Sequence, residues 1–157
     1  MSRMPILVAA ACTLALPALA QARPVTVNVQ LRDYGGDGAY LAVYLTDAQG
    51  NYVRTLWVAG GKAKYYRHLS DWNRLSAGDA GRLAGVTGAS VGAGRSLRVT
   101  ADLADALIDA GYELRVDAAV EDMRESPADV HVPLTRQGAG RPHPGRQYVQ
   151  SLTYVIE

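Results

Sequence analysis

The residues with the clearest chemical potential are the hydroxyls of Thr87 and Ser90, which lie in a glycine-rich part of the chain. Positions 78–94 hold six of the sixteen glycines, and such a density makes a regular helix or strand costly in backbone entropy. We therefore predict a loop from Gly78 to Gly94. In such a loop we expect the hydroxyls to hydrogen-bond water or nearby backbone groups.

The histidines give no pattern for a metal site. No two of them lie within about two to four residues of each other, the spacing that a site on one local element uses. The three residues are His68, His131 and His143. We expect each on solvated surface, with His131 on the outward side of its strand, and we predict no metal. The alternative is a haem or copper ligand set formed by residues distant in the chain.

The sequence also lacks a recognisable catalytic pattern. Residues 88–92 read Gly-Ala-Ser-Val-Gly, without the apolar strand before the serine and the helix after it that a nucleophile elbow requires. The acid pairs Glu121 with Asp122 and Asp102 with Asp105 predict solvated faces rather than a pocket. We therefore expect no catalytic residues and a protein that is not an enzyme.

Alternation of apolar and polar residues predicts the strands that must position the glycine-rich loop. The predicted strands are 25–31, 40–46, 52–59, 96–101, 112–121, 130–134 and 148–156. Residues 47–51 form a short polar loop that joins two of them as a hairpin. A single helical turn is predicted at 70–75 with Ser70 as its cap, and 103–110 allows a short helix or a tight crossover. The pattern predicts an all-β fold, an immunoglobulin-like antiparallel β-sandwich of about seven strands.

Composition and the first twenty residues indicate an exported single domain. The chain has 157 residues, a formal charge of +1, one cysteine, nine tyrosines and no phenylalanine. Residues 1–20 resemble a signal peptide cleaved after Ala20, with Arg3 as its only charge; Cys12 allows a lipoprotein as the alternative. We expect residues 21–157 to form one neutral, thiol-free periplasmic domain without a transmembrane segment or a nucleic-acid partner. Most tyrosines are expected in the core and rim, the alternative being a platform for a sugar or a cofactor.

The chain resembles a known family from its second predicted strand onward. Residues 40–56 read as a strand, an Asp-x-x-Gly turn and Val-Arg-Thr-Leu, and residues 64–66, 69–72, 85–90 and 110–116 follow in the same order. These pieces resemble the predicted periplasmic proteins grouped as domain of unknown function 2271. The Val-Arg-Thr-Leu hairpin and the Gly-Tyr-x-Leu strand also resemble the immunoglobulin-like module of flagellar hook-capping proteins. The usual glycine-bearing turn is missing between Thr100 and Ala110, so the chain path there stays open.

The resemblance implies a redox context and gives the glycine-rich loop a specific role. Members look like accessories of extracytoplasmic redox systems, encoded beside PepSY-type membrane proteins and an FAD:protein FMN transferase, which are the implied partners. Flavinylated domains carry a stretch resembling Asp-x-x-Ser/Thr-Gly-Ala-Ser/Thr, whose last hydroxyl takes the FMN phosphate. Residues 84–90 match this stretch at six of seven positions, with Ala84 in place of the acid and Asp79 too far upstream to replace it.

The expected function is therefore a periplasmic accessory protein of a flavin- or iron-linked redox system, with FMN as the candidate cofactor. The expected attachment point is Ser90, with Thr87 as its substitute and Gly88 and Ala89 beside it. The alternative is a non-redox immunoglobulin-like interaction module that binds a membrane or periplasmic protein.

Overall fold

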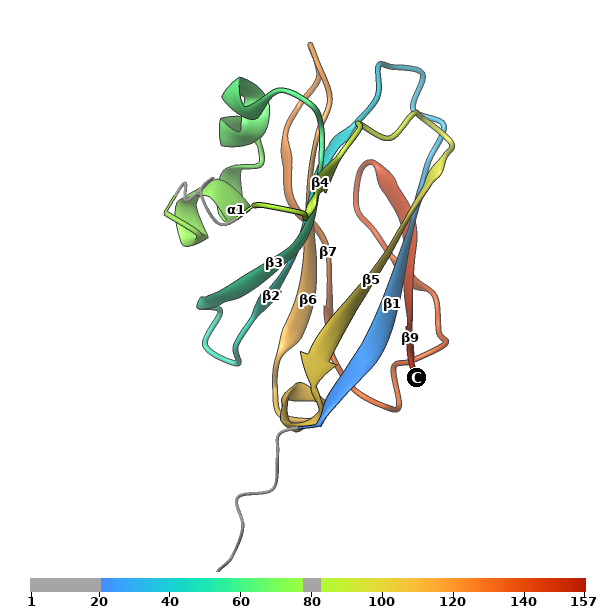
Figure 1. Cartoon of the computed structure of the whole chain (residues 1–157). Helices are drawn as coiled ribbons and strands as arrows, with labels where there is room; N and C mark the ends of the chain where they lie inside the picture. The colour runs from blue at the N-terminus through green and yellow to red at the C-terminus, as the bar shows by residue number, and fades with distance from the viewer. Residues whose placement is uncertain (1–20, 78–82) are drawn as a thin grey trace, which may run out of the picture.

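A computed structural model describes residues 21–77 and 83–157, which form two β-sheets facing each other (Figure 1). The strands are β1 (Ala22–Leu31), β2 (Tyr40–Thr46), β3 (Tyr52–Ala59), β4 (Thr87–Gly88), β5 (Ser96–Ala104), β6 (Glu113–Ala119), β7 (Ser126–Pro133), β8 (His143–Pro144) and β9 (Val149–Ile156). The helical elements are η1 (Ala63–His68), α1 (Ser70–Leu75) and η3 (Asp105–Leu107).

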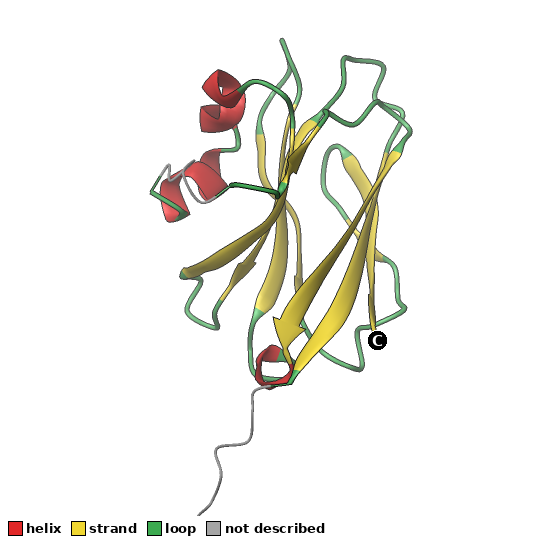
Figure 2. Ribbon diagram, viewed as in Figure 1, coloured by secondary structure: helices red, strands yellow, loops and turns green. Residues whose placement is uncertain are grey.

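One sheet has the strand order β5-β1-β9-β8 and the other the order β4-β3-β2-β6-β7. All pairs are antiparallel except β3 with β4, which is parallel. The β-sandwich predicted from the sequence is confirmed. The seven predicted strands are present, and β4 and β8 are additional two-residue strands in the described part of the chain (Figure 2).

Alternation along the strands explains where the core lies. Val25, Val27 and Val29 on β1 point inward and are at most 1% exposed, against the inward residues of β2 and β6. β2 is buried on both faces, because η1 and α1 cover the outer face of its sheet (Figure 1). Tyr44 on that outer face packs in a second cluster with Trp72 of α1. The helices therefore have a fixed position on the sheet.

Part of the predicted glycine-rich loop is a strand. The expectation of an irregular segment over Gly78 to Gly94 is wrong at Thr87–Gly88, which form β4 at the edge of the sheet. The backbone N–H of Val58 donates to Val86 O at 2.8 Å, and that of Gly60 donates to Gly88 O at 2.7 Å. Pairing with an existing strand thus offsets the entropy cost of the glycines. Asp79 lies outside the described residues.

Two further local expectations are resolved. Ser70 does not cap α1, whose cap position is Leu69 without a side-chain bond. Between Thr100 and Ala110, β5 continues to Ala104 and the chain then crosses through η3 to the other sheet. The crossing uses positive φ at Asp109 (60°) and at Gly111 (86°), and this glycine lies just after the range in which one was expected.

The described residues contain no helix that combines the length and the apolar character needed to span a membrane. The predicted signal peptide, residues 1–20 with Cys12 and the cleavage site after Ala20, lies outside the described residues.

Candidate functional site

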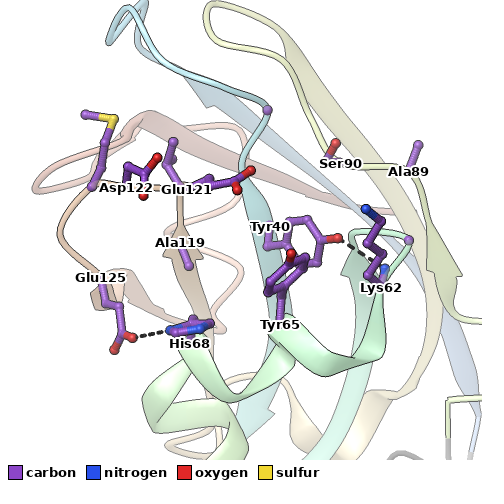
Figure 3. Close-up of a pocket in the computed structure, with 14 residues that line it drawn as sticks. Tyr40, Lys62, Tyr65, His68, Ala89, Ser90, Ala119, Glu121, Asp122 and Glu125 are labelled. Atoms are coloured by element: carbon purple, nitrogen blue, oxygen red, sulfur yellow. Dashed lines mark hydrogen bonds and ion pairs between the residues drawn. The ribbon is translucent and has the colours of Figure 1, made fainter.

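A pocket of about 820 Å³ lies at the end of the five-stranded sheet, beside η1 (Figure 3). Its walls come from the start of β2, the loop into η1, η1 itself, the segment after β4, and the turn between β6 and β7. The chain's own topology brings these five segments together, although they span residues 38–125. The volume falls within the range of about 300–1,000 Å³ typical of small-molecule sites.

Ser90 lines this pocket and its side chain is exposed. The backbone on its C-terminal side is fixed, because Val91 exchanges two hydrogen bonds with Ala39, at 2.7 and 2.9 Å. Within the described residues, the Ser90 hydroxyl has no hydrogen-bond partner in the protein. Gly38 lies against it: a Cβ added there would be 2.9 Å from Ser90 Oγ. The hydroxyl is therefore accessible from solvent, and the residue that lies against it has no side chain.

The other residues predicted around Ser90 divide into two groups. Ala89 is exposed and also lines the pocket. Thr87 is exposed but belongs to β4, where it pairs with Val58 and does not line the pocket. Gly88 is packed against an aromatic ring, since a Cβ there would lie 2.7 Å from Trp57 Cζ2. The structure thus separates the two candidate hydroxyls, and only Ser90 faces the cavity.

Two tyrosines and a lysine form one wall of the pocket. The rings of Tyr40 and Tyr65 meet edge to face with centroids 5.8 Å apart. The backbone N–H of Lys62 donates to Tyr40 Oη at 3.1 Å, which fixes the Tyr40 ring. The Nζ atom of Lys64 lies 4.9 Å from the Tyr65 ring centroid, a cation–π contact. The Lys62 side chain is exposed and extends from this wall toward Ser90 (Figure 3).

The turn between β6 and β7 forms the acidic wall. Glu121 and Asp122 are exposed, as predicted, but the expectation that they belong to no pocket is wrong. Asp122 has φ 58° and the N–H of Met123 donates to Val120 O at 3.1 Å, so the chain folds back in a tight turn. The turn places both carboxylates on the cavity, a result of backbone conformation that the pair of acids by itself does not predict.

His68 and Glu125 close the pocket beside η1 (Figure 3). His68 Nδ1 lies 2.6 Å from Glu125 Oε1, and the two side chains are 41% and 42% exposed. His68 is therefore partly solvated, as predicted, but it also links η1 to the acidic turn. Such a half-exposed contact contributes at most about 1 kcal/mol, so its effect is to position the two walls rather than to hold the fold together.

A buried carboxylate positions the helices that carry this wall. Asp117 on β6 is fully buried and accepts hydrogen bonds from the backbone N–H groups of Trp72 (2.7 Å) and Ala128 (2.8 Å) and from Tyr44 Oη (3.0 Å). The Trp72 indole N–H also donates to Thr55 Oγ1 at 2.9 Å. Burial raises the pKa of Asp117 above its ordinary value of 3.8, because desolvation outweighs these bonds. Asp117 thus supplies the cap that Ser70 was expected to give.

The remaining polar residues singled out in the sequence lie away from the pocket. His131 is exposed, as expected, with Nδ1 3.7 Å from Glu113 Oε2. His143 stacks on Tyr154, with ring centroids 5.9 Å apart. Asp105 is not simply solvated, because it pairs with Arg23 and Arg136. Across residues 21–77 and 83–157, no three acidic or histidine side chains form a group able to hold a metal ion.

A model of the family described as "Predicted periplasmic protein (DUF2271)" matches residues 22–151. The chain belongs to this family. No curated protein and no solved structure matches the chain, so the likeness to the flagellar hook-capping module has no support from these comparisons.

In this DUF2271 member, Ser90 and Ala89 are the predicted cofactor-binding residues that line the pocket, and the prediction did not include the rest of its walls. Tyr40 and Tyr65 were part of a general expectation for tyrosines, in which a cofactor platform was the alternative to the core. A sequence signal for this aromatic wall is the pair Gly60 and Gly61, which stands directly before Lys62. Glycine has no side chain, so an aromatic ring can approach its backbone closely. The acidic turn gave no comparable signal.

Proposed function

We propose that this protein is a periplasmic accessory of an extracytoplasmic redox system and that Ser90 is the attachment point for FMN. The observation that carries the proposal is the exposed Ser90 hydroxyl, which has no protein hydrogen bond within the described residues and lies on the rim of an 820 Å³ pocket. When attached, FMN supplies the electron-transfer chemistry that ordinary side chains lack.

The surroundings of Ser90 support an acceptor that another enzyme modifies. A serine that acts as its own catalytic nucleophile needs an adjacent base to take its proton. Within the described residues no base hydrogen-bonds Ser90 Oγ, and the residue that lies against the hydroxyl is Gly38, which has no side chain. An exposed hydroxyl between small residues is what a transferase must surround. The protein is thus proposed as a carrier, not as a catalyst.

The attachment reaction balances with FAD as the donor. A bond forms between Ser90 Oγ and the phosphorus on the flavin side of the pyrophosphate, and the bond from that phosphorus to the bridging oxygen breaks. AMP leaves with the bridging oxygen, and the hydroxyl proton passes to a base of the FAD:protein FMN transferase. No electrons are exchanged in this step.

The first prediction concerns which hydroxyl is labelled. The chain is coexpressed with an FAD:protein FMN transferase, denatured, and separated on a gel, where covalent flavin is detected by fluorescence that stays with the polypeptide. We expect labelling of the wild type and of Thr87→Ala, and loss of the label in Ser90→Ala. Ser90→Thr keeps a hydroxyl at this position and should still be labelled.

Thr87→Ala is the matched control, because Thr87 is an exposed hydroxyl three residues away in the same motif. A transferase substrate of known behaviour is run in parallel. If that substrate is labelled and the wild-type chain is not, the carrier proposal is contradicted and the non-redox interaction module becomes the better explanation. Label retained in Ser90→Ala would equally contradict Ser90 as the acceptor. We also propose a PepSY-type membrane protein as a partner of this chain in the same redox system.

A further inference from the structure

The aromatic wall of the pocket is more than attachment at Ser90 requires. A hydroxyl on a rim needs only to be accessible, yet Tyr40 and Tyr65 form an ordered edge-to-face pair below it. Both rings are half-buried. Tyr40 is fixed from two further sides, by the N–H of Lys62 at 3.1 Å and by an edge contact with Tyr66 at 6.2 Å. Aromatic rings held in place beside a cavity form a contact surface for a planar ligand.

The positive and negative side chains of the pocket lie on opposite sides of it. Lys62 extends toward Ser90, while Glu121 and Asp122 lie on the facing wall (Figure 3). Lys62 Nζ has no ion-pair partner within the described residues. A phosphate joined to Ser90 is an anion, so it is attracted to the lysine and repelled by the carboxylates. The pocket therefore has one end suited to a phosphate and a facing wall where the carboxylates of Glu121 and Asp122 accept hydrogen bonds.

We propose that Lys62 and Tyr65 seat the attached flavin within this pocket, an inference that rests on the proposed function. Lys62 balances the charge of the phosphate on Ser90, and Tyr65 contacts the ring system. The carboxylates of Glu121 and Asp122 suit the ring's N–H donor and disfavour a second phosphate there. The pocket thereby holds the cofactor in one place instead of leaving it free in solvent on a loop.

The test compares the fluorescence and the acrylamide quenching of attached flavin in the wild type and in pocket variants of the full chain. Each signal is divided by the flavin content of the sample, which is measured after denaturation. A tyrosine in contact with a flavin quenches its fluorescence by electron transfer, and burial shields it from the neutral quencher acrylamide. We expect dim, shielded flavin in the wild type. Tyr65→Leu should brighten it severalfold and expose it. Tyr65→Phe should brighten it but keep it shielded, and Lys62→Gln should increase its exposure.

The controls are Tyr112→Leu and Arg98→Gln, which remove a half-buried ring and an exposed cation away from the pocket. They should leave brightness and shielding unchanged. The inference is overturned if wild-type flavin is as bright and accessible as free FMN, or if Tyr65→Phe and Lys62→Gln both match the wild type. An unlabelled wild-type chain is seen earlier, on the gel, and contradicts the proposed function itself together with this inference.

Discussion

The aromatic wall of the pocket depends on one glycine, Gly60. Gly60 has φ 136°, a conformation that L side chains rarely adopt, and its carbonyl accepts a hydrogen bond from Tyr66 Oη at 2.8 Å. Its N–H donates to Gly88 O at 2.7 Å, which fixes β4. A Cβ at Gly60 would lie 2.3 Å from Tyr40 Cδ2. One residue therefore couples the edge strand, η1 and the pocket wall.

Gly60→Ala is predicted to destabilise the fold by at least about 2 kcal/mol, from backbone strain and from the collision with Tyr40. The measurement is the free energy of unfolding in urea. The control is Gly61→Ala, because Gly61 has no heavy atom within 4 Å of an added Cβ and no positive φ. That variant should stay within about 0.5 kcal/mol of the wild type. Equal values for the two variants would contradict the assigned role of Gly60.

At the scale of elements, the pocket depends on the docking of α1 and η1 on the outer face of the five-stranded sheet (Figure 1). Trp72 is 1% exposed and its ring meets Tyr66 edge to face at 5.9 Å. Asp117 takes the N–H at the start of α1. Because α1 has only six residues, it has little stability of its own, and tertiary contacts must hold it.

Asp117→Asn is predicted to destabilise the protein by about 1–3 kcal/mol, because the amide N–H₂ faces a backbone donor in either orientation. The effect depends on pH. The pKa of Asp117 is raised in the fold, so the wild-type chain is most stable below the ordinary value of 3.8 and loses stability as pH rises through the folded pKa, whereas asparagine does not titrate. The difference between wild type and variant should therefore shrink with rising pH in urea unfolding. A difference that grows with pH would contradict this assignment.

The sequence was informative where one element determines its own structure. The alternation in β1 predicted both the strand and its buried face, because side chains in a strand alternate between faces. In β2 it did not predict that η1 and α1 bury the second face as well. The sequence was uninformative where a partner distant in the chain decides. The two residues of β4 are a strand only because Val58 and Ala59 lie beside them. The α1 cap comes from Asp117, 45 residues away from Trp72.

The same reasoning applies to the candidate site. The small residues around Ser90 follow one another in the chain, so the sequence alone shows them as a motif. Such a run favours an accessible loop, which chemistry at a hydroxyl needs. The pocket was not visible in the sequence, because its aromatic wall follows η1 and its acidic wall follows a turn with positive φ at Asp122. Neither wall has a periodic pattern. Both depend on where the ends of β2 and β6 lie, and that is a property of the assembled sheet.

For the molecule as a whole, the joining of the two sheets depends on a second buried carboxylate. Asp129 on β7 is fully buried. It accepts hydrogen bonds from the backbone N–H groups of Arg146 and Tyr148 at 2.7 Å and of Gln147 at 2.9 Å. These residues lead into β9 of the other sheet. Tyr148 Oη in turn donates to Arg124 O, which belongs to the turn on the acidic wall of the pocket.

Asp129→Ala is predicted to cost at least about 3 kcal/mol, because it leaves several backbone N–H groups between the sheets without an acceptor, at about 1–3 kcal/mol each. The free energy of unfolding in urea measures this. The control is Asp102→Ala, which removes an exposed carboxylate from β5 and should change stability by less than about 0.5 kcal/mol. Since the Arg124 turn is attached to the same segment, hydrogen exchange at residues 120–125 should also increase in Asp129→Ala. Unchanged protection there would mean that the acidic wall is held independently of the contact between the sheets.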